Sequence, residues 1–269
     1  MANFKLENYE GSPNTFTFPI NSTSFDDSNE FQSNITPIPF ENKHIVISKG
    51  AINPKALSIQ GYFTGTNKLD NWNELLELSS SANLKKFYFS EDRFYLVIGT
   101  TFKQTRTGGR NNFIDYVGAM ITPIPFVFSD TLKTASFNGS WTGGTQTNAG
   151  SHQTFMEEVI VTLDSGGSSG DTIIIDSPNN GGITVELPIY GGGDILKIQL
   201  VTMVDTNGYK TSEYWYTTIN GSQYARAISV NKSELDLTLL PNQQIDSFTI
   251  SGTGNYSNIE FKWRDSWLA

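Results

Sequence analysis

Short runs in which apolar and polar side chains alternate recur along most of this chain, and they constrain its fold more than any other feature. The alternation is clearest at Leu57–Phe63, Leu235–Leu239 and Ile259–Trp263. Successive side chains of a strand point to opposite faces, so a period of two indicates a strand with one buried face. The pattern predicts a mainly-β protein built from antiparallel sheets.

One segment follows a helical period instead. Within 68–79, preceded by the possible capping residues Thr66 and Asn67, four large apolar residues recur at helical spacing: Leu69, Trp72, Leu75 and Leu76. Side chains three and four residues apart share one face of a helix. The sequence therefore predicts a single helix that lays this apolar stripe on a neighbouring sheet.

Strand-like runs surround this helix. The candidates in the first half of the chain are Thr15–Ile20, His44–Ser48, Leu57–Phe63, Lys85–Phe89, Arg93–Ile98, Thr100–Arg106 and Asn112–Ile121. The runs after the helix are joined by short turns such as Ser90–Asp92 and Gly108-Gly109, which favours an antiparallel meander. We expect an N-terminal β-sandwich or barrel with one α-helix and a β-hairpin.

The second half reads as strand after strand. The candidates are Glu158–Leu163, Thr172–Asp176, Ile183–Ile189, Ile195–Val204, Glu213–Ile219, Tyr224–Val230, Glu234–Leu240, Ile245–Ser251 and Ser257–Trp263. Turns with Gly or Asn-Gly separate many of them. A series of nine short strands with no predicted helix is typical of an antiparallel β-sandwich or jelly roll, so we predict one of these folds.

Charge and composition change together near the middle of the chain. Residues 1–133 carry 12 basic and 13 acidic side chains, whereas residues 134–269 carry 6 basic and 14 acidic ones. The segment from Ser129 to Gly150 is rich in Gly and Thr, as is typical of a linker between domains. We therefore predict two domains, 1–133 and 134–269.

Composition also excludes several classes of function. The 269-residue chain has no cysteine, which rules out disulfides and cysteine chemistry. Its net charge of −9 is unsuited to gripping nucleic acid. No signal peptide and no apolar run long enough to span a membrane is evident, so we expect no membrane insertion.

Two serine motifs resemble those of hydrolytic enzymes but lack the other residues that catalysis requires. Asp164-Ser-Gly-Gly167 echoes the nucleophile region of trypsin-like proteases, and Gly166–Gly170 fits the Gly-x-Ser-x-Gly elbow of hydrolases. The protease needs a suitably placed His, and the elbow needs a following helix and a downstream His. His44 and His152 both precede the serines in the sequence. The serine motifs are followed by a predicted strand, Thr172–Asp176, and not by a helix. We predict that the chain is not an enzyme.

No cofactor or metal is predicted either. Gly191–Leu196 resembles part of a calcium-binding β-roll repeat, which binds calcium only in tandem copies. A single copy is a turn, and two distant histidines without cysteine give no transition-metal site.

Two sets of residues remain as candidate binding surfaces. Basic residues gather in the central segment, and those predicted to lie at an interface between subunits are Lys85, Lys86, Arg93, Arg106 and Arg110; the alternative is a solvated face of the meander. Aromatic residues that could stack on a sugar are Trp141, Tyr214, Trp215 and Tyr216; the alternative is core packing.

The same stretches resemble a known family. Leu57-Ser-Ile-Gln-Gly-Tyr-Phe-Thr-Gly-Thr, the Leu69-x-x-Trp-x-x-Leu-Leu helix, Lys86-Phe-Tyr-Phe, Arg93-Phe-Tyr-Leu-Val-Ile and Tyr116-Val-Gly-Ala-Met-Ile are similar in order and spacing to the N-terminal domain of phage distal tail proteins. The end of the chain, Leu239-Leu-Pro-Asn-Gln-Gln-Ile and Ile259-Glu-Phe-Lys-Trp-Arg-Asp-Ser-Trp-Leu, resembles the galectin-like C-terminal domain of that family. It departs at Pro241-Asn242, where Pro-Gly is commoner.

The resemblance implies a structural virion protein made in the host cytoplasm. Such proteins form a hexameric ring at the distal end of the tail, and the ring joins the tail tube to the tail-tip hub and the receptor-binding proteins. DNA passes through the ring without specific binding, and the C-terminal domain can contact a host-surface glycan. Two alternatives stay open from the residues alone: a glycan-binding β-sandwich protein, and a tail-associated hydrolase that the missing nucleophile–base pair disfavours.

Overall fold

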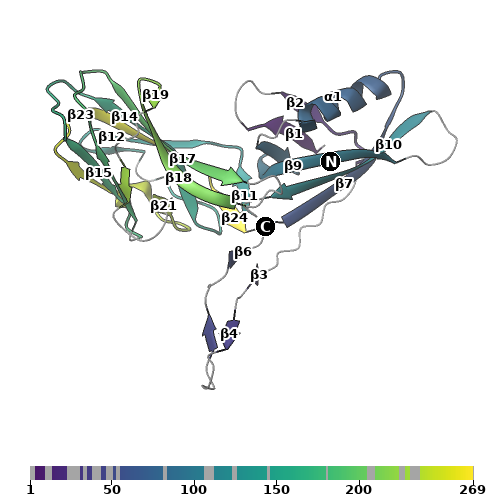
Figure 1. Cartoon of the computed structure of the whole chain (residues 1–269), viewed down its shortest axis with the longest axis horizontal. Helices are drawn as coiled ribbons and strands as arrows, with labels where there is room; N and C mark the ends of the chain where they lie inside the picture. The colour runs from purple at the N-terminus through teal and green to yellow at the C-terminus, as the bar shows by residue number, and fades with distance from the viewer. Residues whose placement is uncertain are drawn as a thin grey trace. The chain divides into compact units, whose positions relative to one another are not determined.

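The computed structural model describes residues 4–9, 14–22, 31–32, 35–37, 44–46, 51–52, 55–80, 84–105, 112–122, 126–143, 146–179, 181–204, 210–223, 228–230 and 237–268. The chain forms two compact units, the first mainly Met1–Val127 and the second mainly Phe128–Met203 and Ser212–Leu268. The described part is dominated by antiparallel strands and contains a single α-helix, α1 (Lys68–Ser80), so the prediction of a mainly-β fold is confirmed (Figure 1).

The first unit is one antiparallel sheet with α1 on one of its faces. Its strands run in the order β2-β1-β8-β9-β10-β7. Their bounds are β1 Lys5–Asn8, β2 Thr15–Thr17, β7 Lys55–Thr64, β8 Lys85–Tyr88, β9 Arg93–Thr105 and β10 Phe113–Thr122. Short strands pair elsewhere in this half: β3 Phe31–Gln32 with β6 Ala51–Ile52, and β4 Ile35–Pro37 with β5 His44–Val46.

The core of the first unit is largely aromatic. Phe18 packs against Phe87, Phe102 and Tyr116, and Phe63 stacks on Tyr116 with ring centroids 4.8 Å apart. Leu75 and Leu78 of α1 are the buried residues of the helix. The helix extends as predicted, but its buried stripe differs: Leu69 is 58% exposed, Trp72 and Leu76 are half-buried, and Leu78 takes part instead.

Strands Arg93–Ile98 and Thr100–Arg106 were predicted separately and are one strand, β9. Its register against β10 shifts between the pairs Ala119–Thr101 and Ile121–Ile98. Such a β-bulge inserts an extra residue and changes which side chains face the core. The bulge interrupts the period-two pattern without ending the strand.

The second unit is a sandwich of two antiparallel sheets. One sheet runs in the order β13-β12-β23-β14-β17-β18-β19, with β21 also paired to β14, and the other in the order β20-β16-β15-β22. The strands are β12 Lys133–Phe137, β13 Trp141–Thr142, β14 Thr154–Leu163, β15 Thr172–Asp176, β16 Gly182–Glu186, β17 Ile195–Val204, β18 Lys210–Ile219, β19 Ser222–Gln223, β20 Ile228–Val230, β21 Thr238–Leu239, β22 Thr249–Gly252 and β23 Tyr256–Trp263. The remaining strands, β11 Phe126–Ser129 and β24 Ser266–Leu268, pair with each other.

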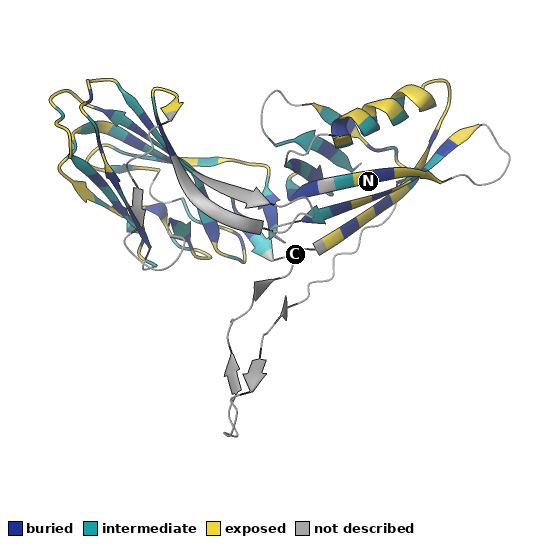
Figure 2. Cartoon of the chain, in the orientation of Figure 1, coloured by how far each residue is buried: buried dark blue, intermediate teal, exposed yellow. Residues whose placement is uncertain are grey.

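Side chains from both sheets meet in one buried cluster, which includes Met156, Ile175, Val185, Phe261 and Trp263. Figure 2 shows buried residues recurring along the strands of this unit. Each of these strands places alternate residues inside, as the sequence pattern predicts. One predicted strand is different, because Ile245–Ser247 forms a 3-10 turn before β22. Residues 224–227 and 234–236, which belong to two other predicted strands, lie outside the described residues.

The core of the second unit predicts a position-specific loss of stability. Ile175 is fully buried, whereas Ile189 is 79% exposed. We expect Ile175→Ala to lower the free energy of unfolding by about 2–5 kcal/mol, because it removes buried methyl groups and leaves a cavity. Ile189→Ala is the same chemical change and should leave stability nearly unchanged. Chemical denaturation of both variants tests this, and equal losses would contradict it.

Candidate functional site

The edge of the first sheet is the most distinctive surface of the first unit. Strand β7 pairs with β10 on one side, and no strand in the described part of the chain pairs with its other side. The carboxamide of Asn21 bonds this free edge at Tyr62: Asn21 Nδ2 donates to the Tyr62 carbonyl at 3.0 Å, and the Tyr62 N–H donates to Asn21 Oδ1 at 3.3 Å. Because strand backbone groups alternate in direction, the N–H and C=O of Ser58 and Gln60 also point to this edge.

Buried hydrogen bonds hold Asn21 in place. Tyr116 is buried beneath β7, and its hydroxyl lies 2.6 Å from the hydroxyl of Ser22, which itself donates to the carbonyl of Pro19 at 2.6 Å. Burial raises the pKa of Tyr116 to about 12, and the hydrogen bond with Ser22 acts in the opposite direction. A Cβ on Gly61 would lie 2.6 Å from the Tyr116 hydroxyl, so glycine is needed for this close approach.

The face of the sheet opposite α1 carries exposed apolar residues. Tyr62 is 42% exposed, Phe113 38% and Val117 40%, and the rings of Tyr62 and Phe113 lie 5.9 Å apart. Figure 2 shows buried and exposed residues alternating along β7 and β10. A free strand edge beside exposed apolar side chains is a surface suited to pairing with another chain.

The predicted subunit-interface residues do not form one exposed basic patch. Lys85 is fully buried, and this burial lowers its pKa. Lys86 Nζ lies 3.4 Å from the carboxylate of Glu7 and over the ring of Phe94, 5.3 Å from the ring centroid. Arg93 lies 4.0 Å from the carboxylate of Asp92. Arg106 and Arg110 lie outside the described residues. The role of these five residues between subunits stays a prediction.

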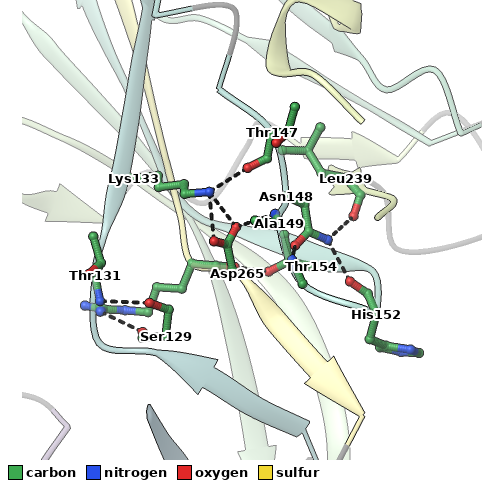
Figure 3. Close-up of polar contacts among 12 residues, drawn as sticks. Ser129, Thr131, Lys133, Thr147, Asn148, Ala149, His152, Thr154, Leu239 and Asp265 are labelled. Carbon is green, nitrogen blue, oxygen red and sulfur yellow. Dashed lines mark hydrogen bonds and ion pairs between the residues drawn. The ribbon is translucent and has the colours of Figure 1, made fainter. Parts of the chain in front are cut away.

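In the second unit, a polar cluster joins the loop 146–154 to the end of the chain (Figure 3). Lys133 Nζ lies 2.8 Å from Asp265 and donates to the Thr147 carbonyl at 2.7 Å, and the Ala149 N–H donates to Asp265 at 2.9 Å. Buried Asn148 donates to the carbonyls of His152 and Leu239 at 2.6 and 3.2 Å. The bonding capacity of these groups is used within the chain, so we interpret the cluster as structural.

A second ionic network lies on the outer face of β14, β17 and β23. Glu158 accepts from Lys262 at 2.9 Å and from Lys197 and Gln199 at 3.2 Å each, and Lys262 also lies 3.2 Å from Glu260. Burial alone would raise the pKa of Glu158, but the hydrogen bonds and charges of the two lysines lower it overall. This face is therefore polar and internally paired.

The predicted sugar-stacking residues are placed in part. Trp141 is half-buried and packs against Phe137 and Phe261, with ring centroids 5.3 and 5.2 Å away. Tyr214, Trp215 and Tyr216 belong to β18, and their side chains are outside what the structure describes. That these four residues form a sugar-stacking platform stays a prediction.

The serine loop and the Gly191–Asp194 turn are explained by local hydrogen bonds. The Ser165 N–H donates to Asp164 Oδ1 at 2.7 Å, and the Gly191 N–H donates to Asp194 Oδ2 at 2.8 Å. Among the residues that the structure describes, no group of three His, Asp or Glu side chains could hold a metal ion. The helix of the described chain is also too short and too polar to cross a membrane.

Comparison with solved structures identifies the fold. The chain is similar to the Dit protein of phage SPP1, described as a paradigm of the hub adsorption apparatus of phages that infect Gram-positive bacteria, with a TM-score of 0.56 and 12% identity over 97% of this chain and 98% of that one. It is also similar to a chain of the phage P2 baseplate in its activated conformation with Ca, with a TM-score of 0.51 and 11% identity over 98% of both chains.

No family model matches the sequence, and no curated protein matches it either. The likeness to the two phage structures spans both units, so the chain has the fold of a Dit-like phage tail protein. At such low identity, the likeness lies in the order and arrangement of the elements.

The ion pair between Lys133 and the buried carboxylate of Asp265 predicts unequal roles for two lysines. Lys133→Met should lower the free energy of unfolding by about 3 kcal/mol, because it leaves the buried Asp265 carboxylate without its cation. Lys197→Met removes a more exposed partner of Glu158 and should cost less than about 1 kcal/mol. Urea unfolding of both variants gives the comparison, and a loss at Lys197 as large as that at Lys133 would refute it.

The ionic network around Glu158 predicts a pH-dependent contribution to stability. The folded state lowers the pKa of Glu158 from its ordinary value of 4.5, so its contribution is present above that value and is lost as the pH falls through the folded pKa. Glu158→Gln should therefore reduce stability at neutral pH by about 1 kcal/mol, allowing for solvent screening.

The difference between Glu158→Gln and the wild type should shrink when the pH is lowered below the folded pKa. Thermal unfolding across the pH range measures this. Glu186→Gln, at an exposed end of β16, is the matched control and should follow the wild type at every pH. A deficit of Glu158→Gln that stays constant into acid would contradict the assignment.

Proposed function

We propose that this chain is a distal tail protein of a long-tailed phage, a structural component of the virion without enzymatic activity. The observation that carries the proposal is the similarity to the Dit hub protein over nearly the full length of both chains. Similarity to a baseplate chain over the same extent points to the same part of a tail. The absence of a metal-binding group among the described residues is compatible with a scaffold but does not establish one.

In this proposal, six copies form a ring through the first unit. The free edge of β7 and the exposed Tyr62, Phe113 and Val117 provide one surface for contact between neighbouring copies. Strand addition at a sheet edge satisfies backbone groups that otherwise face water, and a head-to-tail contact repeated by rotation closes into a ring. The ring joins the tail tube to the tail-tip hub and receptor-binding proteins and lets DNA pass without specific binding.

The second unit is proposed to be the galectin-like domain that projects from the ring. Its sandwich fold and its internally paired polar face suit contacts with other tail proteins. A glycan-binding protein is the alternative function. The packing of Trp141 against Phe137 and Phe261 gives that alternative less support, because both neighbours restrict access to the indole ring.

The ring is tested by light scattering and negative-stain imaging of the purified protein. We expect a particle of several times the 29.8 kDa chain mass, with a central hole wide enough for duplex DNA. A protein that stays monomeric and also fails to assemble with its tail-tube protein would contradict the proposal. Binding of the monomer to a glycan array would then favour the alternative.

A proline at the strand edge tests the contact itself. The N–H of Gln60 points away from β10, so Gln60→Pro removes no hydrogen bond within the sheet but blocks the addition of a strand there. We expect this variant to remain folded, with a melting temperature near that of the wild type, and to lose the ring. Gln60→Ala keeps the N–H and should still form rings. A ring that persists in the proline variant would exclude this edge as the contact.

A further inference from the structure

The chain contains the tripeptide Asn-Gly-Ser at two hairpin loops that the structure describes. Asn138-Gly139-Ser140 connects β12 to β13, with Phe137 paired to Trp141. Asn220-Gly221-Ser222 begins the turn between β18 and β19, with Ile219 paired to Ser222. All six residues are exposed, so access to water does not distinguish the two loops.

The side chain of Asn220 is held by two hydrogen bonds. Its Oδ1 accepts from the Ile195 N–H at 2.9 Å, and its Nδ2 donates to Asp194 Oδ1 at 2.8 Å. The backbone N–H of Asn220 also donates to the Ile195 carbonyl at 2.9 Å. Asn220 and Gly221 both have positive φ, at 50° and 79°, as a two-residue hairpin turn of this kind requires.

The side chain of Asn138 is held far less firmly. Its Oδ1 has one weak contact, with the Ser140 hydroxyl at 3.5 Å. Its backbone N–H donates to the Ser140 carbonyl at 3.3 Å. This bond closes the loop but does not restrain the side-chain carboxamide. The carboxamide of Asn138 is therefore free to rotate while the hairpin stays formed.

Asparagine followed by glycine can deamidate without an enzyme. The deprotonated backbone nitrogen of the glycine attacks the side-chain carbon Cγ, ammonia leaves, and a five-membered succinimide forms. Water then opens this ring to give aspartate or isoaspartate. The overall change consumes one water, releases one ammonia, and adds one negative charge without oxidation or reduction.

We propose that Asn138 is a site of spontaneous deamidation in the folded protein and that the fold protects Asn220 from the same reaction. The attack requires Cγ to approach the following backbone nitrogen in a reactive geometry. Asn138 reaches it by rotating a side chain that one weak contact holds. Asn220 reaches it only after both side-chain hydrogen bonds open.

The protected position is also where the product would be most harmful. An aspartate at 220 would place its carboxylate against that of Asp194, in a contact of 2.8 Å that now depends on an amide donor. Like charges at this distance repel, and the link between the two turns would be lost. At Asn138 the new charge would face water, beside residues that are exposed themselves.

Peptide mapping by mass spectrometry of the full chain, incubated in mildly alkaline buffer, measures both reactions in one sample. In the folded protein, Asn138 should deamidate at least about tenfold faster than Asn220, because opening two hydrogen bonds must precede reaction at Asn220. In urea the two sites should react at similar rates, since both are Asn-Gly-Ser. Similar rates in the folded protein, or a faster reaction at Asn220, would overturn the proposal.

Asp194→Ala tests the cause of the protection, because it removes the acceptor of the Asn220 amide. This variant should speed deamidation of Asn220 and leave the rate at Asn138 unchanged, so that Asn138 serves as an internal standard. A change confined to Asn220 also separates the local effect from unfolding, which would accelerate both sites. No acceleration at Asn220 in the folded variant would refute the assigned role of Asp194.

Discussion

The backbone groups along the free edge of β7 impose the constraint on which the first unit depends. A strand at the edge of a sheet exposes a row of N–H and C=O groups, and a folded protein must cover, block or use them. Here Asn21 blocks the row at Tyr62 with a carboxamide that mimics a peptide group. The arrangement requires the buried Tyr116 and Ser22 hydroxyls and the space that Gly61 provides. The edge is thus covered at Tyr62, and the backbone groups of Ser58 and Gln60 are the ones that we propose pair with a neighbouring copy.

The second unit depends on a different constraint. The first and last strands of its sandwich are far apart in the sequence and must pair within one sheet. Strand β23 pairs with both β12 and β14, so the last long strand lies inside a sheet that begins at Lys133. The ion pair between Lys133 and Asp265 fixes that arrangement beside the sheet. Gly150 allows the backbone of Ser266 to approach, since a Cβ there would lie 1.8 Å from the Ser266 carbonyl oxygen.

Much of this architecture could be predicted from period-two and helical patterns, because those patterns record which side chains are buried. Strand Thr172–Asp176 follows its pattern closely, and the helix begins at Lys68 as predicted. The failures have physical causes. The bulge in β9 interrupts the alternation, Leu69 is exposed at the start of the helix, and Ile245 is buried in a 3-10 turn whose apolar residues resemble a strand.

The candidate surface was harder to predict than the fold, since it depends on groups that carry no sequence signal. Charge drew attention to Lys85 and Lys86, whose role between subunits stays a prediction; within their own unit, Lys85 is buried and Lys86 is paired with Glu7. The free edge of β7 consists of backbone atoms, which every residue possesses, and it is visible only once the strand order is known. A scaffold that assembles through backbone pairing needs the alternation of its strands to persist, while the identities of most side chains can change. The likeness to the SPP1 Dit structure, at 12% identity over nearly whole chains, likewise lies in the fold and not in the identities of side chains.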